Sequence, residues 1–362
     1  MLNPQESRIH QDLSTASDNP QTGERLNSKI WGDRDAFKAL EPGKNPVEDT
    51  LDLPPLDLDV TVRQAHNADK GDRSPVWQGK GELPFTPGET TKESIEIDGE
   101  KRTFLLHVPE SYDPNKPTHL IMAYHGITST GAEMEGRTGL SNRSESDNFI
   151  VAYMEGDPEG RHSWNNGQLA FSGLDDVKFT RETLAKISEN LHIDKEHVYA
   201  VGFSQGESMV HRLANEPELK NTFKAIGVVG GWMTGREKIQ SDPDNPDSDD
   251  LSVISIKSGA DPTSPYDGKF HWGFANMKPE SYEEDFYRRR NEVPEPAKES
   301  TFYNDEGKLI RSQFLSEDPG SGKKVMRVRI EDEGHIWPGT PETVHKENDA
   351  TDMILKFFRS LD

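Results

Sequence analysis

A Gly-x-Ser-x-Gly pattern constrains the fold of this chain more than any other feature. It occupies residues 202–206, directly after the apolar run 197–201 and directly before the helix-like run 207–215. A serine in this context sits on a sharp strand-to-helix turn that exposes its hydroxyl group. Side chains at the two flanking glycines would collide with the neighbouring backbone. The pattern therefore predicts that Ser204 is a nucleophile rather than a structural turn serine.

Strand and helix patterns alternate through most of the chain. Asp98-Gly99 is a hairpin turn signal that opens this region. Alternating strands and helices predict an α/β fold, with a mostly parallel sheet and helices on both faces. The expected strands are 94–97, 103–108, 120–124, 149–154, 197–201, 225–229, 252–256 and 325–330, and the expected helices are 175–191 and 352–361.

Composition divides the chain into two regions. Hydrophobic residues make up only 31% of it and charged residues 30%, so part of the chain is not expected to form a core. Residues 1–88 are rich in Asp, Asn, Gln, Pro and Ser and predict an acidic, weakly ordered extension, partly disordered or wrapped on the domain. A targeting address and a partner-binding segment are the functional alternatives. Residues 89–362 are the expected catalytic domain, with insertions at 232–250 and 264–300.

The two insertions allow different interpretations. Residues 241–250 are an Asp-rich loop that could bind calcium, but it lacks the glycine and glutamate of an EF-hand loop. A solvated acidic loop is favoured, and no metal is expected. The 264–300 insertion is rich in aromatic residues. It fits a packed subdomain and the wall of an acyl or aryl pocket equally well.

Charge and cysteine content exclude several classes of function. A net charge of −23 argues against nucleic-acid partners and against anionic membrane surfaces. The absence of cysteine excludes disulfides, thiolate catalysis and cysteine-ligated zinc. No apolar stretch of 18 residues predicts a membrane span, and residues 1–20 lack a hydrophobic signal. We therefore expect a cytoplasmic protein by default, or one secreted by a signal-independent route. Oligomeric state cannot be inferred from these features.

A serine nucleophile needs a base, and the base needs an acid to orient it, in the chain order Ser, Asp or Glu, His. Asp261 follows a predicted strand and a glycine turn, whereas its competitor Asp267 lies further from the strand end. His335 follows the last predicted strand, and Gly334 lets that loop turn back toward Ser204. We therefore predict Asp261 as the acid and His335 as the base. The rival histidines are His125, His211 and His271.

An oxyanion hole needs two backbone donors. We expect one from Gln205, next after the nucleophile, and one from the loop at Gly126, where the donor is Ile127 or its neighbour Thr128. His125 is expected to brace that loop rather than transfer protons. Trp164 fits a core position and a pocket wall equally well. The candidates for contact with substrate are His125, Trp164, Tyr266 and Trp337.

From about Thr91 onward the chain resembles the α/β-hydrolase esterase family of polyhydroxybutyrate depolymerases and feruloyl or acetylxylan esterases. This resemblance implies the α/β-hydrolase fold and carries the nucleophile to Ser204, the acid to Asp261 and the base to His335. The chain departs from the family's usual pattern by having Glu207 where a second glycine is usual, Ile127 where a cysteine is common, and the acidic extension. The matching stretches are His125-Gly126, Trp164-Asn165, Asp175-Asp176-Val177, Ile193-Asp194 with Val198-Tyr199, Gly202 to Gly206, Asp261 to Tyr266, and Gly334 to Gly339.

These observations predict a serine carboxylic-ester hydrolase that works through an acyl-enzyme and needs no cofactor. The resemblance implies feruloyl or acetyl esters of polysaccharides, or hydroxyalkanoate polyesters, as substrates. A serine peptidase of the prolyl-peptidase kind is an alternative, although such enzymes usually carry a large gating domain. A non-catalytic binding protein on the same fold is the other alternative, and it predicts a broken triad.

Overall fold

The computed structural model describes residues 85–157, 159, 161–167, 173–233, 251–268, 277–294 and 297–362. Nearly all of the predicted N-terminal extension lies outside these residues, as does the Asp-rich 241–250 loop. The centre of the aromatic insertion, 269–276, also lies outside them. The predictions made for these segments therefore stay predictions.

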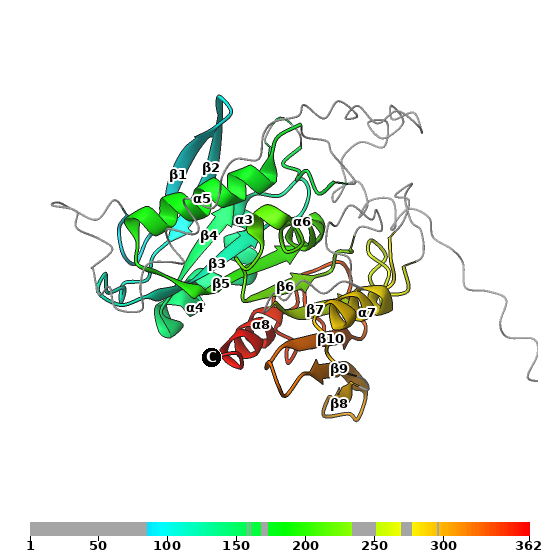
Figure 1. Cartoon of the computed structure of the whole chain (residues 1–362). Helices are drawn as coiled ribbons and strands as arrows, with labels where there is room; N and C mark the ends of the chain where they lie inside the picture. Colours follow the sequence, from blue (N-terminus) through cyan, green and yellow to red (C-terminus); the bar gives the residue numbers. More distant parts are fainter. Residues whose placement is uncertain are drawn as a thin grey trace, which may run out of the picture. The chain divides into compact units, whose positions relative to one another are not determined.

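A ten-stranded mixed sheet forms the centre of the described part (Figure 1). Its strand order is β1-β2-β4-β3-β5-β6-β7-β10-β9-β8. The six strands from β4 to β10 in this order are parallel, and the strands outside them pair antiparallel. The strands are β1 (Thr90–Ile97), β2 (Glu100–His107), β3 (Thr118–Tyr124), β4 (Phe149–Met154), β5 (Ile193–Phe203), β6 (Ala225–Val229), β7 (Ser252–Ser258), β8 (Lys298–Tyr303), β9 (Leu309–Glu317) and β10 (Lys324–Ile330).

Helices cover both faces of the sheet, as expected for buried parallel strands. Successive side chains of a strand point to opposite faces, so Leu120 and Met122 pack in one core while Ile121 and Ala123 pack in the other. The first core includes residues of α5, α6 and α7, and the second includes residues of α3, α4 and α8. The helices are α3 (Gly131–Thr138), α4 (Leu140–Asp147), α5 (Asp176–Asn190), α6 (Gln205–Leu213), α7 (Glu280–Arg290) and α8 (Ala350–Arg359).

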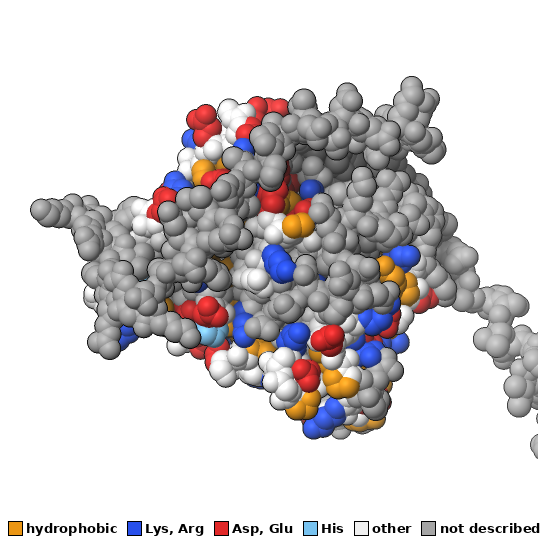
Figure 2. Space-filling model, viewed as in Figure 1, with side chains coloured by type: hydrophobic (Ala, Val, Ile, Leu, Met, Phe, Trp, Pro, Cys, Tyr) orange, Lys and Arg blue, Asp and Glu red, His pale blue; other side chains and the backbone are white. Residues whose placement is uncertain are grey.

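The sequence patterns locate the central elements well. The predicted hairpin is confirmed, with Asp98 and Gly99 both at positive φ between β1 and β2. The pattern missed β8 and β9, the antiparallel edge that follows α7. β8 is almost entirely exposed, so it lacks the apolar alternation that marks a half-buried strand. Figure 2 shows acidic and basic side chains interspersed over the part of the molecule where β8, β9 and β10 lie.

The parallel strands place the loops of interest at one edge of the sheet. His125 follows β3, Ser204 follows β5 and Asp261 lies shortly after β7, while His335 lies in the loop after β10. The carboxyl ends of parallel strands meet at the same edge, which is where ligands bind in open α/β sheets. No helix in the described ranges is long and apolar enough to span a bilayer.

Candidate active site

Ser204 occupies the sharp turn between β5 and α6. Its backbone has φ 55° and ψ −119°, a conformation that a non-glycine residue rarely adopts. Its N–H donates to the carbonyl of Val229 at 2.9 Å, which holds the turn against β6. A Cβ on Gly202 would lie 2.4 Å from the carbonyl oxygen of Gly206, and one on Gly206 would lie 2.1 Å from that of Tyr124. Both flanking glycines are therefore required by close backbone packing.

The side chains of Ser204, His335 and Asp261 form a continuous hydrogen-bonded chain. His335 Nε2 lies 2.9 Å from Ser204 Oγ, and His335 Nδ1 lies 2.7 Å from Asp261 Oδ2. The other oxygen of Asp261 accepts the N–H groups of Thr263 at 2.7 Å and Ser264 at 3.0 Å. These backbone donors hold the carboxylate, and with it the imidazole, in a set orientation.

The loop that carries His335 is fixed from several sides. The His335 ring lies on Phe203, with 5.1 Å between ring centroids. The hydroxyl of Ser258 donates to the carbonyl of Glu333, which ties the loop to the end of β7. The Glu333 carboxylate in turn accepts the N–H of Val344 at 3.0 Å. The base therefore belongs to a packed loop rather than to an exposed one.

The rival residues lie in other surroundings. His211 is buried on α6, where its Nδ1 lies 2.9 Å from the Tyr287 hydroxyl. His125 is buried, and its ring bonds to backbone groups. The carboxylate that is hydrogen-bonded to His335 is that of Asp261, and not that of its rival Asp267. His271 lies outside the described residues.

Two backbone N–H groups beside Ser204 suit an oxyanion. Gln205 is the first residue of α6, so its N–H has no partner within the helix. A Cβ on Gly126 would lie 3.2 Å from that of Ser204, which places the 126–127 loop directly beside the nucleophile. The N–H of Thr128 donates to the Arg161 carbonyl, whereas that of Ile127 has no acceptor in the described part of the chain. Residue 126 is glycine because its backbone lies close to Ser204, and not because it needs a positive φ. The residue of this loop with a positive φ is Thr128, at 62°.

His125 braces this loop as a neutral imidazole. Burial lowers the pKa of His125 to about 4. Its Nε2 accepts the Gly156 N–H at 3.0 Å, so Nδ1 carries the proton and donates to the Gly126 carbonyl at 2.7 Å. The indole of Trp164 donates to the His125 carbonyl at 2.7 Å, and Gln205 accepts the Trp164 N–H at 3.1 Å. These contacts link the two ends of the candidate oxyanion hole.

Three of the four residues predicted to contact substrate are buried. His125 and Trp164 are fully buried and Trp337 is 1% exposed, so these side chains support the site's loops from inside. The Trp337 indole donates to Thr351 on α8 at 3.0 Å. The Tyr266 hydroxyl is hydrogen-bonded to Arg327 on β10 at 2.5 Å. For the two tryptophans and His125, burial argues against direct contact with substrate and resolves the choice for Trp164 in favour of the core.

A buried ionic network behind the nucleophile was missed by the sequence patterns. Lys257 on β7 lies 3.0 Å from Glu207 on α6, 2.8 Å from Glu280 and 2.9 Å from Glu283 on α7. Burial alone would lower the pKa of Lys257, but the three carboxylates hold it well above its ordinary value. His211 joins the network 3.3 Å from Glu283. The one hint of this network in the sequence was Glu207, which stands where the resembled family usually has glycine.

Burial also raises the pKa of Glu280 to about 7. It acts in the same direction on Glu283, yet Lys257 and His211 together lower the pKa of that group. The pKa values of these two carboxylates, which share one ammonium group, therefore shift in opposite directions. The reason is that the site can stabilise one negative charge better than two.

The mixed sheet and the serine elbow define an α/β-hydrolase. No family model matches the chain. The solved acetyl xylan esterase from Aspergillus awamori has this fold, with a TM-score of 0.51, 15% identity and coverage of 75% of this chain and 99% of that one. That likeness is one of fold.

Sequence comparison finds relatives that are named as esterases. NocK of Nocardia uniformis subsp. tsuyamanensis, which is named as an esterase, is 28% identical over 280 residues, covering 71% of this chain and 76% of that protein. Feruloyl esterase C of Emericella nidulans is 29% identical over 174 residues, covering 46% of this chain and 57% of that protein. The chain is therefore similar in sequence to carboxylic ester hydrolases, and it has the α/β-hydrolase fold.

Proposed function

We propose that this esterase hydrolyses its substrate through an acyl-enzyme on Ser204, with His335 as general base and Asp261 as its orienting acid. The observation that carries the proposal is the unbroken path from Ser204 Oγ to His335 Nε2 at 2.9 Å and from His335 Nδ1 to Asp261 at 2.7 Å. A serine hydroxyl is a weak nucleophile at neutral pH, and a base within hydrogen-bond reach removes that limitation.

The reaction has two steps. Ser204 attacks the ester carbonyl as His335 takes its proton, and the N–H groups of Gln205 and Ile127 donate to the oxyanion. His335 then protonates the leaving alcohol, and the alcohol departs from an acyl-serine. Water, deprotonated by His335, attacks this ester and releases the acid, which restores the serine hydroxyl. The residues named here need no metal or organic cofactor.

The substrate we propose is a feruloyl or acetyl ester of a polysaccharide, and a hydroxyalkanoate polyester is the alternative. The first choice is supported by the relatives named as feruloyl esterases. The described residues contain no feature that favours a peptidase, and aminoacyl anilides serve as the control substrates for that alternative.

Replacing Ser204 with Ala tests the nucleophile. We expect turnover of nitrophenyl acetate to fall by at least about 10³-fold and labelling by a fluorophosphonate to disappear. The melting temperature should change little, because the hydroxyl makes one side-chain hydrogen bond. Persistent labelling of the variant at another residue would disprove the assignment.

Steady-state rates on methyl ferulate, acetylated xylan and hydroxybutyrate oligomers test the substrate. We expect a higher kcat/KM for the feruloyl or acetyl ester than for the oligomers. Faster turnover of the oligomers would assign the polyester instead, and faster turnover of aminoacyl anilides would assign a peptidase.

A further inference from the structure

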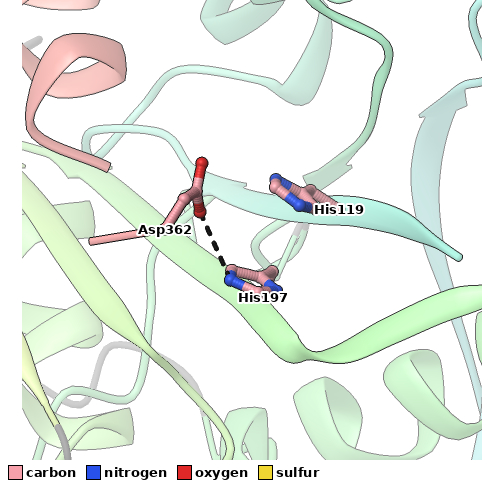
Figure 3. A group of neighbouring side chains, drawn as sticks. All are labelled: His119, His197 and Asp362. Atoms are coloured by element: carbon pink, nitrogen blue, oxygen red, sulfur yellow. Dashed lines mark ion pairs between the residues drawn. The ribbon is translucent and has the colours of Figure 1, made fainter. Parts of the chain in front are cut away.

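A second cluster of chemically active side chains lies at the opposite end of the central strands from Ser204. His119 stands near the start of β3 and His197 lies in β5, the neighbouring parallel strand. The two imidazoles are stacked, with 4.5 Å between centroids and 14° between planes. Asp362, which follows α8, points its carboxylate at them (Figure 3). The candidate ligand atoms of all three residues lie within 4.8 Å of one another.

Not every polar group here is paired in the way that polar groups away from solvent normally are. The His119 ring, which is half-buried, makes no hydrogen bond to any described residue. The Tyr199 hydroxyl is buried and lies near the Asp362 carboxylate. His119, Tyr199 and Asp362 line one cavity of about 210 Å³. Arg359 borders the same cavity, but it is paired with Asp147 at 3.1 Å. The cavity therefore has largely apolar walls, and among its polar groups the His119 ring has no hydrogen bond to a described residue.

His197 has the hydrogen-bonding arrangement of a metal ligand. Its Nδ1 lies 2.9 Å from the carboxylate of Asp194, which is the second contact that usually fixes a ligating imidazole. Its Nε2 faces Asp362 Oδ1 at 3.3 Å. Two ligands bound tetrahedrally at about 2.1 Å from one ion lie about 3.4 Å apart.

We propose that His119, His197 and Asp362 bind a divalent late transition-metal ion, with Zn²⁺ as the expected occupant. Two imidazoles and one carboxylate are a ligand set that zinc accepts, and water would complete the tetrahedron. An imidazole binds a metal in its ring plane, and the two rings are stacked at 14°, so the His119 ring has to turn about its side-chain bonds when the ion binds. The charge also fits, because the carboxylates of Asp194 and Asp362 balance a divalent ion held by two neutral imidazoles. The competing arrangement is an imidazolium at His197 between the two carboxylates, which leaves the His119 ring without a hydrogen bond to any described residue.

The proposed site is structural rather than part of ester hydrolysis. Ser204 lies seven positions after His197 along the extended chain of β5, which corresponds to about 23 Å. An ion there would fasten the residues after α8 to the first half of two central strands. Binding that favours the native state raises the melting temperature, by about 5 °C at a metal concentration one hundred times the Kd for a domain of this size.

Titration of the EDTA-treated full chain with ZnCl₂, followed by calorimetry and by thermal unfolding, tests the proposal. We expect one site whose affinity falls at least tenfold in His119→Gln, His197→Gln and Asp362→Asn. Asp362→Asn keeps the shape of an exposed side chain, so it should fold normally. The matched control is His192→Gln, whose half-buried ring lies 3.2 Å from the Pro114 carbonyl and should leave zinc binding unchanged.

Three results would overturn the site. Zinc affinity equal to that of the unchanged chain in both His119→Gln and Asp362→Asn would place binding elsewhere. Equal stabilisation by Mg²⁺, which prefers an all-oxygen shell, would contradict the imidazole ligands. Histidine nitrogen NMR signals showing His197 doubly protonated at pH 7.5, and unmoved by one equivalent of Zn²⁺, would establish the imidazolium pair instead.

Discussion

The carboxylate of Glu207 accepts a hydrogen bond of 2.6 Å from the backbone N–H of Gly231. Glu207 lies three residues after Ser204 on α6, and Gly231 lies just beyond β6. A side chain at residue 231 would lie 2.2 Å from the Ser204 carbonyl, so the two segments are in backbone contact. The glutamate that replaces the usual family glycine therefore clamps the loop behind the proposed nucleophile and connects it to Lys257.

Lys257→Met should destabilise the fold strongly. The substitution leaves three buried carboxylates, those of Glu207, Glu280 and Glu283, without their cation. Removing one partner of a buried ion pair typically costs about 3–5 kcal/mol, which urea denaturation would measure. Lys308→Met, at an exposed lysine, is the control and should leave the unfolding midpoint unchanged. Equal midpoints for the two variants would mean that the network is not a stabilising element.

Asp261→Asn should lower kcat by about 10⁴-fold with little change in KM, because an amide in this position favours the wrong imidazole tautomer. Asp267→Asn, at the rival acid, should retain most activity. The measurement is steady-state hydrolysis of nitrophenyl acetate at saturating substrate. A larger loss in the Asp267 variant than in the Asp261 variant would reverse the assignment of the acid.

His125 should make the fold sensitive to mild acid. Its folded pKa of about 4 lies below the ordinary 6.5, so the unfolded chain binds more protons between these values. This residue therefore contributes stability above about pH 6.5 that is lost as the pH falls through 4. The full contribution is roughly 3 kcal/mol, from the 1.36 kcal/mol of each pKa unit.

The measurement is the difference in unfolding free energy between the unchanged chain and His125→Gln from pH 4 to 7. Glutamine can replace both hydrogen bonds but does not titrate in this range. We expect the difference to shrink toward acid pH. A constant difference would show that His125 does not carry this pH dependence.

Gly206→Ala should destabilise the folded chain by about 4 kcal/mol or more. The new methyl group would clash with the carbonyl oxygen of Tyr124, which is fixed within the central sheet. Gly136→Ala is the matched control, since a Cβ there has no neighbour within 4 Å and residue 136 lies inside α3. That change should be neutral or stabilising by about 0.5–1 kcal/mol. Soluble expression and melting temperature provide the comparison, and equal effects would contradict the packing argument.

Local sequence patterns predicted the central strands, the elbow and the order of Ser204, Asp261 and His335. Each of these depends on a short local segment of sequence: a β-branched run, glycines at a set spacing, or a polar residue shortly after a strand. The same patterns failed for β8, which is exposed and polar, and for α7. They also left Trp164 undecided, because burial depends on what packs against a residue rather than on its neighbours in sequence.

The sequence alone thus determined the fold class and the candidate nucleophile, because strand–turn–helix chemistry is local. Tertiary structure alone decided that three carboxylates pack around Lys257 behind Ser204 and that His119 faces His197. Residues 119 and 197 meet because β3 and β5 are neighbours in the sheet order. Strand order and register arise from packing over the whole chain, so contacts between distant segments cannot be inferred from any one segment's pattern.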